Sequence, residues 1–336
     1  MVTSHQVARL AGVSQPTVSR ALRDSAKVSE ETKRRVREAA VVLGYVPSAN
    51  GRALSVGRSY RVGLLVTDLN NQFYPHVIAS MHEALEELGY QLILITESSD
   101  AGPVADRIAA NGLDGVLLAT TASDSVLPVR LRDRGIPFVY FNRTAAAIEA
   151  DSVTVDPVLG ADALVNELVG LGHREVAAIF GPRNTSTGEG RETCFRELLS
   201  AAGITIPARW VRHGEFDYAS GHSGARALLT ADPAPSVIVC ANDVVALGAL
   251  NAAAELGIAV PEEVSVVGFD DLPTSSWPLV QLATVAYDLD EMSREAARLL
   301  VQRLDDPTVA SYQHLVYPTR FQHRRSLGPA ARGGRG

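Results

Sequence analysis

The sequence is poor in cysteine and contains no long apolar run. Only Cys194 and Cys240 occur in 336 residues, too few for a framework of disulfide bonds. No stretch of 18 apolar residues is present, so no transmembrane helix is predicted. The residues after Met1 have neither the basic segment nor the apolar segment of a secretory signal. We therefore expect a cytoplasmic protein without a membrane partner.

Motifs for metals, cofactors and covalent catalysis are missing as well. No Cys and His residues have the spacing of a metal site. Gly188 and Gly190 lack the third glycine of a phosphate-binding loop, and no nucleophile motif accompanies a base. The sequence therefore predicts no metal, no cofactor and no enzymatic activity.

Charge is distributed unevenly along the chain. Residues 1–59 hold ten Lys and Arg against four Asp and Glu, whereas the whole chain holds 31 against 38. The remaining residues are therefore strongly acidic. A basic head on an acidic body is expected where only the head binds a polyanion such as nucleic acid.

The basic head has the pattern of three short helices. The segment Thr3-Ser4-His5-Gln6 is a capping box before an apolar run that stops at Gly12. Ser14 can cap a second helix after a turn of the length that a helix-turn-helix requires. A third helix is predicted over residues 29–44.

The second helix carries side chains that suit DNA recognition. In a helix-turn-helix the early residues of this helix meet base edges in the major groove. Gln15 can pair with adenine and Arg20 with guanine, while short hydroxyls such as Thr17 suit phosphate or base edges. The apolar pattern alone would fit any three-helix bundle.

Short sequence motifs in a fixed order distinguish a DNA-binding head from other three-helix bundles. They are Val7-Ala8, Ala11-Gly12-Val13-Ser14, Thr17-Val18-Ser19-Arg20, Val28-Ser29-Glu30-Glu31-Thr32 and Leu43-Gly44-Tyr45-x-Pro47. With them, the head closely resembles that of the lactose-repressor/galactose-repressor family of bacterial regulators. The resemblance implies a homodimer that binds a pseudo-palindromic double-stranded DNA operator. The DNA contacts that we expect are Thr3, Ser14, Gln15, Pro16, Thr17, Ser19 and Arg20.

Residues 47–59 follow the predicted DNA-binding domain of residues 1–46. The segment from Pro47 to Leu54 looks like the hinge helix of the family, which implies minor-groove contacts by Arg52 and Leu54. A flexible linker is the alternative, because Asn50 and Gly51 are weak helix formers.

The body alternates strand and helix patterns, which predicts an α/β fold with parallel sheets. Amphipathic helices are expected at 74–88, 161–171 and 244–256. The apolar strand runs are 62–66, 92–95, 115–118, 138–141, 176–180, 237–240 and 264–269.

Further short sequence motifs link the body to a known type of domain. They are Asp68-Leu-Asn-Asn-Gln-Phe73-Tyr74, Leu113-Asp114-Gly115, Leu171-Gly172-His173-Arg174, Gly181-Pro182, Cys240-Ala-Asn242-Asp243 and Val266-Val-Gly-Phe-Asp270-Asp271. The body resembles the periplasmic-binding-protein-like effector domain of the same family. This implies two lobes, 60–157 plus 289–317 and 158–288 plus 318–325, with three crossovers near residues 157, 288 and 318. We expect the tail, 326–336, to be disordered.

The resemblance also implies a small-molecule effector in the cleft between the lobes, at the carboxyl ends of the strands. Arg191 and Asp270 are expected to hold it from opposite sides, and a sugar or a related polar metabolite fits these residue types. The candidate contacts are Phe73, Tyr74, Asn142, Arg143, Arg191, Phe216, Asn242, Asp270 and Tyr287.

The interpretation that the sequence favours is a transcriptional regulator, most simply a repressor. Two other classes of protein are the alternatives. The body alone could be an extracytoplasmic solute receptor, but the basic head and the missing signal argue against it. An α/β enzyme is disfavoured by the missing catalytic motifs. The sequence therefore favours a regulator that is cytoplasmic and associates with the nucleoid when it binds DNA.

Overall fold

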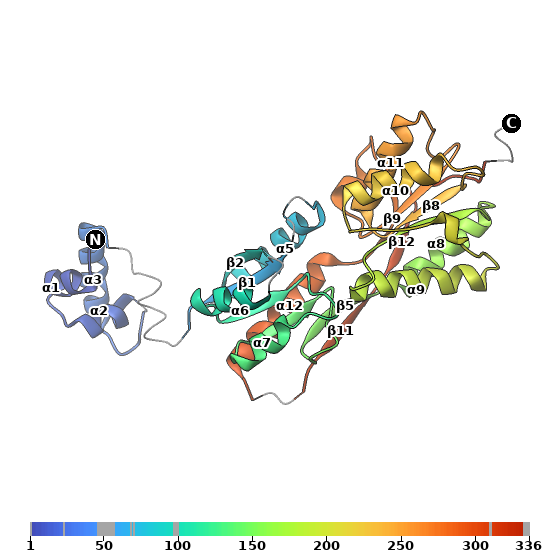
Figure 1. Cartoon of the computed structure of the whole chain (residues 1–336). Coiled ribbons are helices and arrows are strands. Elements are labelled where there is room, and N and C mark those ends of the chain that lie inside the picture. The colour runs from blue at the N-terminus through green and yellow to red at the C-terminus, as the bar shows by residue number, and fades with distance from the viewer. Residues whose placement is uncertain are drawn as a thin grey trace. The chain divides into compact units, whose positions relative to one another are not determined.

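A computed structural model describes most of the chain and divides it into two compact units. The described residues are 2–22, 24–45, 58–67, 69, 71–96, 101–308 and 311–331. The units comprise residues 1–59 and 60–336. Figure 1 traces the chain through both, from the blue head to the red end of the body. We call them the head and the body and describe each by itself.

The described residues of the head form three helices, α1 (Ser4–Ala11), α2 (Gln15–Leu22) and α3 (Glu30–Leu43). This confirms the predicted helices. Gly12 and Gly44 end α1 and α3 with φ angles of 64° and 61°, a left-handed conformation that glycine adopts without strain. Ser29 is the N-cap of α3, and its hydroxyl accepts a hydrogen bond from the backbone N–H of Thr32.

Two basic side chains of the head serve its own fold. Lys33 is 4% exposed, and its Nζ lies 3.1 Å from Asp24 and 2.7 Å from Glu30. A buried ammonium group is tolerated only with such partners. Arg35 donates to the carbonyl oxygen of Ala11, which satisfies a carbonyl at the end of α1. These two cations therefore stabilise the bundle.

The described part of the body contains two six-stranded sheets. The strand pairs of the first sheet are parallel, and the second differs only in an antiparallel pair between β10 and β12. In order across the first sheet, the strands are β11 (His314–Pro318), β5 (Ser152–Asp156), β4 (Phe138–Phe141), β3 (Gly115–Leu118), β1 (Arg61–Val66) and β2 (Gln91–Thr96). Across the second sheet they are β12 (Arg320–Gln322), β10 (Ala283–Ala286), β9 (Ser265–Phe269), β8 (Val237–Cys240), β6 (Val176–Phe180) and β7 (Val211–His213).

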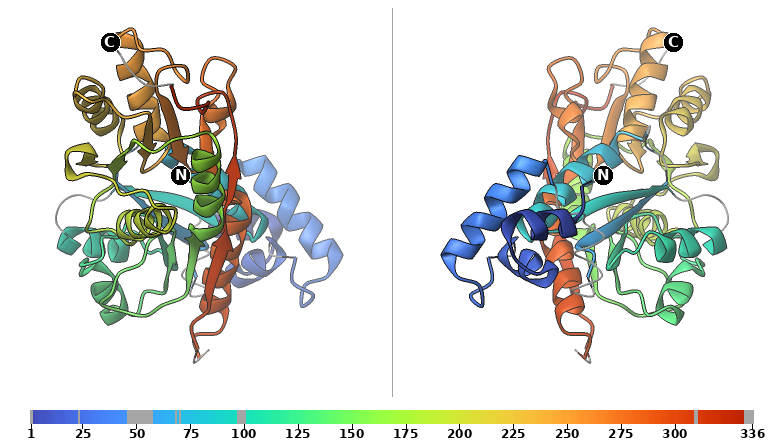
Figure 2. Two further views of the ribbon diagram at one scale, coloured as in Figure 1. Left: turned by 90° about the vertical axis from the view of Figure 1, so that its right-hand side faces the viewer. Right: turned by 90° about the vertical axis from the view of Figure 1, so that its left-hand side faces the viewer.

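Helices cover both faces of the first sheet, which explains why its central strands read as continuous apolar runs. Leu64 and Leu117 pack on the side of two of the helices listed next, those of residues 73–87 and 289–305, whereas Leu65 and Leu118 pack on the side of the helices of residues 101–110 and 127–133. The helices of this lobe are α5 (Phe73–Glu87), α6 (Ala101–Ala110), α7 (Leu127–Asp133) and α12 (Leu289–Asp305). The second lobe holds α8 (Val158–Gly170), α9 (Ser186–Ala201), α10 (Tyr218–Leu229) and α11 (Asp243–Glu255), with short 3-10 turns at Ala208–Trp210 and Pro273–Ser276. Figure 2 shows these layers from two further sides.

The chain passes between the lobes at three places in the described residues. It leaves β5 of the first sheet for α8, returns from β10 to α12, and crosses again from β11 to β12. These positions confirm the predicted crossovers near 157, 288 and 318. The strands β5, β7, β10, β11 and β12 were not predicted. β7 and β12 have only three residues each, β5 alternates polar and apolar residues, β11 is exposed at every second residue, and the four residues of β10 include the polar Thr284.

The expectation of a disordered tail from residue 326 is wrong for its first residues. Ser326 and Leu327 are each 3% exposed, and the Ser326 hydroxyl donates to Val266 O while it accepts from Ala283 N. His173, which is fully buried, contacts the carbonyl oxygen of Gly328 at 2.9 Å through its Nε2. Pairing with the second sheet therefore outweighs the glycine-rich composition. Residues 332–336 lie outside the described residues.

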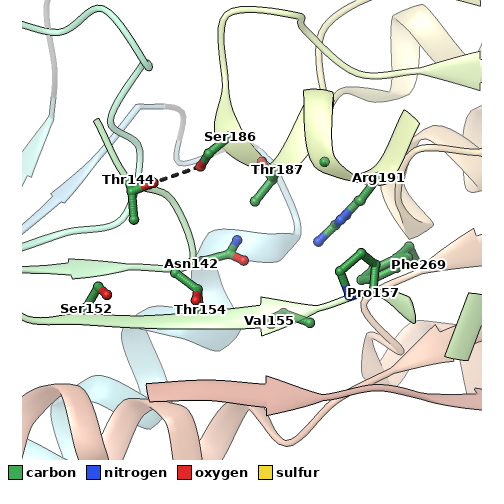
Figure 3. Close-up of a pocket in the computed structure, with 11 residues that line it drawn as sticks. Asn142, Thr144, Ser152, Thr154, Val155, Pro157, Ser186, Thr187, Arg191 and Phe269 are labelled. Carbon is green, nitrogen blue, oxygen red and sulfur yellow. Dashed lines mark hydrogen bonds between the residues drawn. The ribbon is translucent and has the colours of Figure 1, made fainter. Parts of the chain in front are cut away.

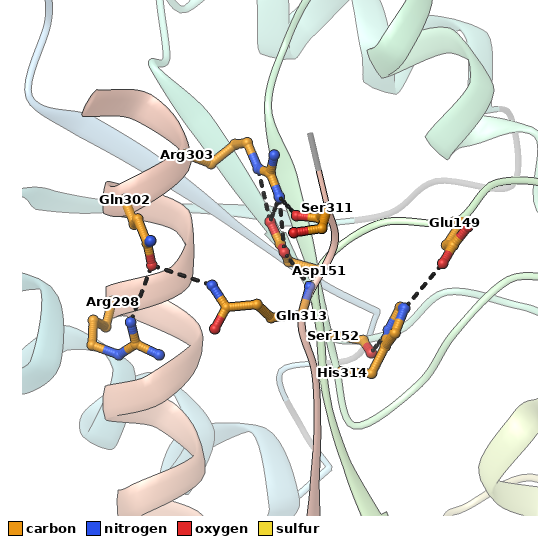
Figure 4. Close-up of polar contacts among 9 residues, drawn as sticks. All are labelled: Glu149, Asp151, Ser152, Arg298, Gln302, Arg303, Ser311, Gln313 and His314. Carbon is orange, nitrogen blue, oxygen red and sulfur yellow. Dashed lines mark hydrogen bonds and ion pairs between the residues drawn. The ribbon is translucent and has the colours of Figure 1, made fainter. Parts of the chain in front are cut away.

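A buried ion pair fastens α12 to the first sheet (Figure 4). Arg303 donates from Nε and Nη2 to the two carboxylate oxygens of Asp151, at 2.9 and 3.0 Å. Asp151 also accepts from the backbone N–H of Gln313, just before β11. Its side chain is only 3% exposed. The carboxylate, which stands just before β5, thus binds the end of α12 and the start of β11, 152 and 162 positions later in the sequence.

This ion pair predicts that two arginines of α12 contribute differently to the stability of the fold. Arg303→Met leaves a buried carboxylate without its cation and should lower the free energy of unfolding by about 3 kcal/mol. Arg298→Met removes a cation that is 45% exposed and paired with Glu295, so its cost should stay below about 1 kcal/mol. Urea unfolding measures both, and equal losses would contradict the role given to Asp151.

Candidate functional site

The predicted DNA contacts of the head gather around the start of α2. Pro16 and Arg20 are exposed, and Gln15 is half-buried with its amide nitrogen 3.4 Å from the Ser4 hydroxyl. The hydroxyls of Ser14 and Thr17 lie 2.8 Å apart, and Ser19 is half-buried. At the start of α1, the backbone N–H of Thr3 donates to Gln6 Oε1 over 2.8 Å. Arg52 and Leu54, the predicted minor-groove residues, lie outside the described residues.

In the body, the cleft candidates come together around one narrow cavity of about 20 Å³. Its walls come from both lobes, at the carboxyl ends of the parallel strands, as in other α/β folds. The ninth candidate, Tyr287, lies beside it and donates from its hydroxyl to Asp270 over 3.1 Å. The lining residues are Asn71, Phe73, Tyr74, Asn142, Arg143, Thr187, Arg191, Phe216, Asn242 and Asp270.

Two of the polar residues that line the cavity, Asn142 and Asp270, have a strained backbone conformation. Asn142 has a φ of 63°, and Arg143 N donates back to Phe141 O over 2.7 Å, which makes a tight turn directly after β4. Asp270 has a φ of 112° directly after β9. Such conformations cost about 1–3 kcal/mol each and concentrate at functional sites.

Arg191 and Asp270 bind each other instead of facing each other across a ligand. Arg191 Nη2 donates to Asp270 over 2.8 Å, and Nη1 donates to the carbonyl oxygen of Ala241 over 2.8 Å. The guanidinium carbon lies 3.7 Å from the ring centre of Phe269, and the two charged side chains are 7% and 4% exposed. The expectation that they hold a ligand from opposite sides is therefore wrong for this structure: the pair forms the back of the cavity.

Burial shifts the ionisation of the acids near this pair. It raises the pKa of Asp270, although the Arg191 guanidinium opposes that rise. Burial also raises the pKa of Asp243, to about 7, and the negative charge of Asp270 adds to this rise. The oxygens of Asp243 accept from the Leu272 N–H and the Ser275 and Thr284 hydroxyls.

Hydrogen bonds between the lobes hold the cleft narrow. Asn71 Nδ2, before α5, donates to Phe216 O over 2.5 Å. Thr144 N donates to the Ser186 hydroxyl over 3.0 Å. Ser123 N donates to Asn184 O over 2.8 Å. The first partner in each bond belongs to the first lobe and the second partner to the second lobe, so opening the cleft must break these contacts.

A second cavity of about 240 Å³ adjoins the first and shares Asn142, Thr187 and Arg191 with it (Figure 3). Sequence reasoning missed most of its walls, because β5 and the first turn of α9 carry no motif. Helix capping at Thr185 was the available signal for the position of Ser186 and Thr187. The missed residues are Thr144, Ser152, Thr154, Val155, Pro157, Ser186, Thr187, Gly190 and Phe269, with Asn71 in the first cavity.

Three buried polar atoms at these cavities have no hydrogen-bond partner within the described protein. They are Asn142 Oδ1, Arg143 Nε and Thr187 Oγ1. An acceptor, a donor and a hydroxyl that can do both match the hydrogen-bonding pattern of a polar small molecule. Leaving such groups unpaired costs about 1–3 kcal/mol each, so a ligand that pairs them gains affinity.

Among the described residues there is neither a metal-binding cluster of side chains nor a membrane-spanning helix. No three His, Cys, Asp or Glu side chains among them could share a metal ion. None of their helices is both long enough and apolar enough to span a membrane.

Comparisons with known proteins agree on both units. The model of the bacterial regulatory proteins of the lacI family matches residues 3–48, and that of the periplasmic binding protein-like domain matches residues 165–327. The transcriptional regulator CelR of Thermobifida fusca is 34% identical and aligns over 96% of this chain and 98% of its own. The ribose operon repressor of Haemophilus influenzae is 30% identical over 97% and 99% of the two chains.

Solved structures share the fold over nearly the whole chain. The complex of CelR with cellobiose has a TM-score of 0.73 at 33% identity, covering 97% of this chain and all of that one. The lac repressor dimer bound to operator and the anti-inducer ONPF has a TM-score of 0.85 at 25% identity, covering 97% and 98%. With a helix-turn-helix head, a two-lobed body and relatives matched from end to end, this chain belongs to the LacI family of bacterial transcriptional regulators.

Proposed function

We propose that this regulator represses transcription as a cytoplasmic homodimer on a pseudo-palindromic operator, and that a sugar or related polar metabolite in the cleft controls its affinity for DNA. The observation that carries the proposal is the cavity between the lobes, where eight of the nine predicted side chains meet. The relatives are regulators and not enzymes, and one of them was solved with cellobiose bound.

The geometry of α2 supports DNA reading through its first turns. Pro16 and Arg20 are exposed, whereas Val18 and Ala21 are buried against the other helices of the head. One face of α2 thus builds the core and the other is free to enter a major groove. In this proposal Arg20 pairs with guanine, Gln15 with adenine, and the hydroxyls of Ser14, Thr17 and Ser19 contact phosphates or base edges. Arg52 and Leu54 remain proposed minor-groove contacts.

Base reading by Arg20 predicts a change in sequence preference. Arg20→Ala should weaken operator binding by about 1–3 kcal/mol per half-site and relax selectivity at one base pair. Arg34→Ala is the control, because Arg34 is equally basic but lies on α3, 66% exposed and paired with Glu38. A binding selection on randomised operators at fixed salt measures both. Unchanged selectivity in Arg20→Ala would refute the assignment.

The cleft suits a hydroxyl-rich ligand. Phe73, Tyr74 and Phe216 supply flat apolar walls for the faces of a sugar ring. The unpartnered atoms of Asn142, Arg143 and Thr187 supply both donors and an acceptor. Because the cavity is bounded by both lobes, a ligand there changes the balance between open and closed cleft, which is how it would control the DNA-binding state.

A pair of threonines at the start of α9 tests the effector site. Thr187→Val removes a hydroxyl without a protein partner, so stability should be unchanged while effector affinity falls about three- to tenfold. Thr185→Val removes the N-cap that accepts from Gly188 N, so it should cost about 1 kcal/mol of stability and affect the effector less.

The effector for this test comes from a thermal-shift screen of sugars, polyols and nucleobases. A ligand at 100 times its Kd adds about 2.7 kcal/mol to stability. Titrations of both variants then follow. If Thr187→Val binds the hit as tightly as the wild type, the hit does not contact Thr187 in the cleft as proposed.

An exposed apolar surface on the second lobe supports the homodimer. Leu279 is 96% exposed and Trp277 is 57% exposed, beside a hollow of about 210 Å³ lined by Leu250, Ile258 and Val280. Exposed apolar patches of this kind are typical of interfaces. A second copy is the occupant that we propose, because the lac repressor was solved as an operator-bound dimer.

The dimer proposal predicts the effect of a charge on this surface. Leu279→Asp should shift the chain toward monomer in sedimentation experiments and weaken operator binding, since two linked heads bind with avidity. Leu159→Asp, on α8 and 62% exposed, is the matched control and should leave both properties unchanged. An unchanged dimer with Leu279→Asp would place the interface elsewhere.

A further inference from the structure

The two arginines of the cleft differ in what they are free to bind. We propose that Arg143 binds an anionic group, phosphate or carboxylate, of the effector, so that the cleft selects an acidic or phosphorylated sugar over its neutral parent. The inference rests on the effector role proposed above and deepens it, because it names the residue that chooses among polar ligands.

The hydrogen-bonding groups of Arg191 are already bound to other residues of the protein. Both of its terminal nitrogens donate hydrogen bonds, one to the Asp270 carboxylate and one to the Ala241 carbonyl oxygen. Its guanidinium stacks on Phe269 at 3.7 Å, and the side chain is 7% exposed. Its charge is thus neutralised by a partner at contact distance, and little of it remains for a ligand.

Arg143 is not committed in this way. Its Nε is buried without a hydrogen-bond partner. Asp270 interacts with it electrostatically but forms its hydrogen-bonded ion pair with Arg191. The guanidinium carbon of Arg143 lies 5.1 Å from the ring centre of Phe216, on the opposite lobe, so the aromatic ring holds the cation over the cavity. The tight turn at Asn142 fixes the backbone from which the side chain starts.

The charges around the two cavities leave an excess of one cation. Among the described lining residues are Arg143, Arg191 and Asp270, and the other lining residues are neutral. Asp243 lies behind the wall, where three protein donors occupy its oxygens and burial raises its pKa to about 7. Asp270 is thus the one carboxylate among the described lining residues, and its hydrogen-bonded ion pair is with Arg191, which leaves the charge of Arg143 for a ligand.

Helix ends add to this positive potential. The α5 helix begins at Phe73 and α9 at Ser186, and residues of the first turn of each line the cavities. The amino end of a helix carries a partial positive charge that favours anions. Together with Arg143, these ends suit an anionic oxygen group at one end of a ligand. The hydroxyls and aromatic rings of the remaining walls suit the polyol body of a sugar.

Inorganic phosphate and acetate test the anion site without knowledge of the effector. Binding to the full chain is measured by equilibrium dialysis for the wild type, Arg143→Met, Arg143→Lys and Arg132→Met. Arg132 is the control, because it is an arginine of the same lobe, 60% exposed on α7. We expect Arg143→Met to remove one binding site or weaken it at least about tenfold, Arg143→Lys to retain part of the affinity, and Arg132→Met to match the wild type. Retained binding of both anions by Arg143→Met overturns the proposal, as does a wild type that binds neither.

Matched sugars then test selectivity and separate the two proposals. Glucose, gluconate and glucose 6-phosphate are titrated with operator affinity and thermal shift as readouts. A preference for either anionic member that disappears in Arg143→Met supports the inference, and the preferred member distinguishes carboxylate from phosphate. A neutral sugar that binds the cleft as tightly as its anionic derivatives overturns the inference while the effector role stands. If Arg143-dependent anion binding is found but no cleft ligand changes operator affinity, the effector role fails and the anion site stands.

Discussion

The cleft exists because three crossovers bring the carboxyl ends of two parallel sheets together. Each parallel strand releases its chain at the same edge, so the loops after β1 and β4 and those after β6, β8 and β9 meet around one cavity. The position of nearly every candidate side chain in the body follows from this constraint. A ligand there contacts two lobes that are connected by three crossing segments and by hydrogen bonds across the cleft, so its binding is linked to the opening of the cleft.

Local signals made much of this architecture predictable. Glycine in the left-handed conformation ends α1 and α3 where the sequence places Gly12 and Gly44. The central strands were predictable because burial on both faces leaves an apolar run, and the residue after such a strand is a cleft residue, as Asn142 and Asp270 are. By contrast, β5 alternates polar and apolar residues and forms a crossover, so its contribution of Thr154 and Val155 to the second cavity had no signature.

Contacts between residues that are far apart in the sequence could not be predicted from local sequence patterns. Arg191 and Asp270 are 79 positions apart, and each alone looks like a ligand-binding residue. Only the fold shows that they satisfy each other. Arg324, just before the tail, gives a similar lesson. It donates to Asp271 over 2.6 Å and to Leu282 O over 2.8 Å, and thereby secures a strained aspartate with φ of 54° next to the cleft. Composition suggested disorder from residue 326, but pairing with the second sheet decides the structure there.

In this fold, the residues that select the ligand can change without a change in the path of the chain. The lac repressor shares the architecture with a TM-score of 0.85 at 25% identity, so three quarters of the aligned positions differ while the path of the chain persists. The walls of the cleft sit on loops after strands, where a change of side chain costs little in core packing. Arg143 occupies such a position, unlike Arg191, whose ion pair and aromatic stacking make it part of the lobe's interior. A substitution at Arg143 alters the charge offered to a ligand and removes no hydrogen bond of its Nε, only the contact with the Phe216 ring. This is the physical condition under which specificity can change while the regulator still folds.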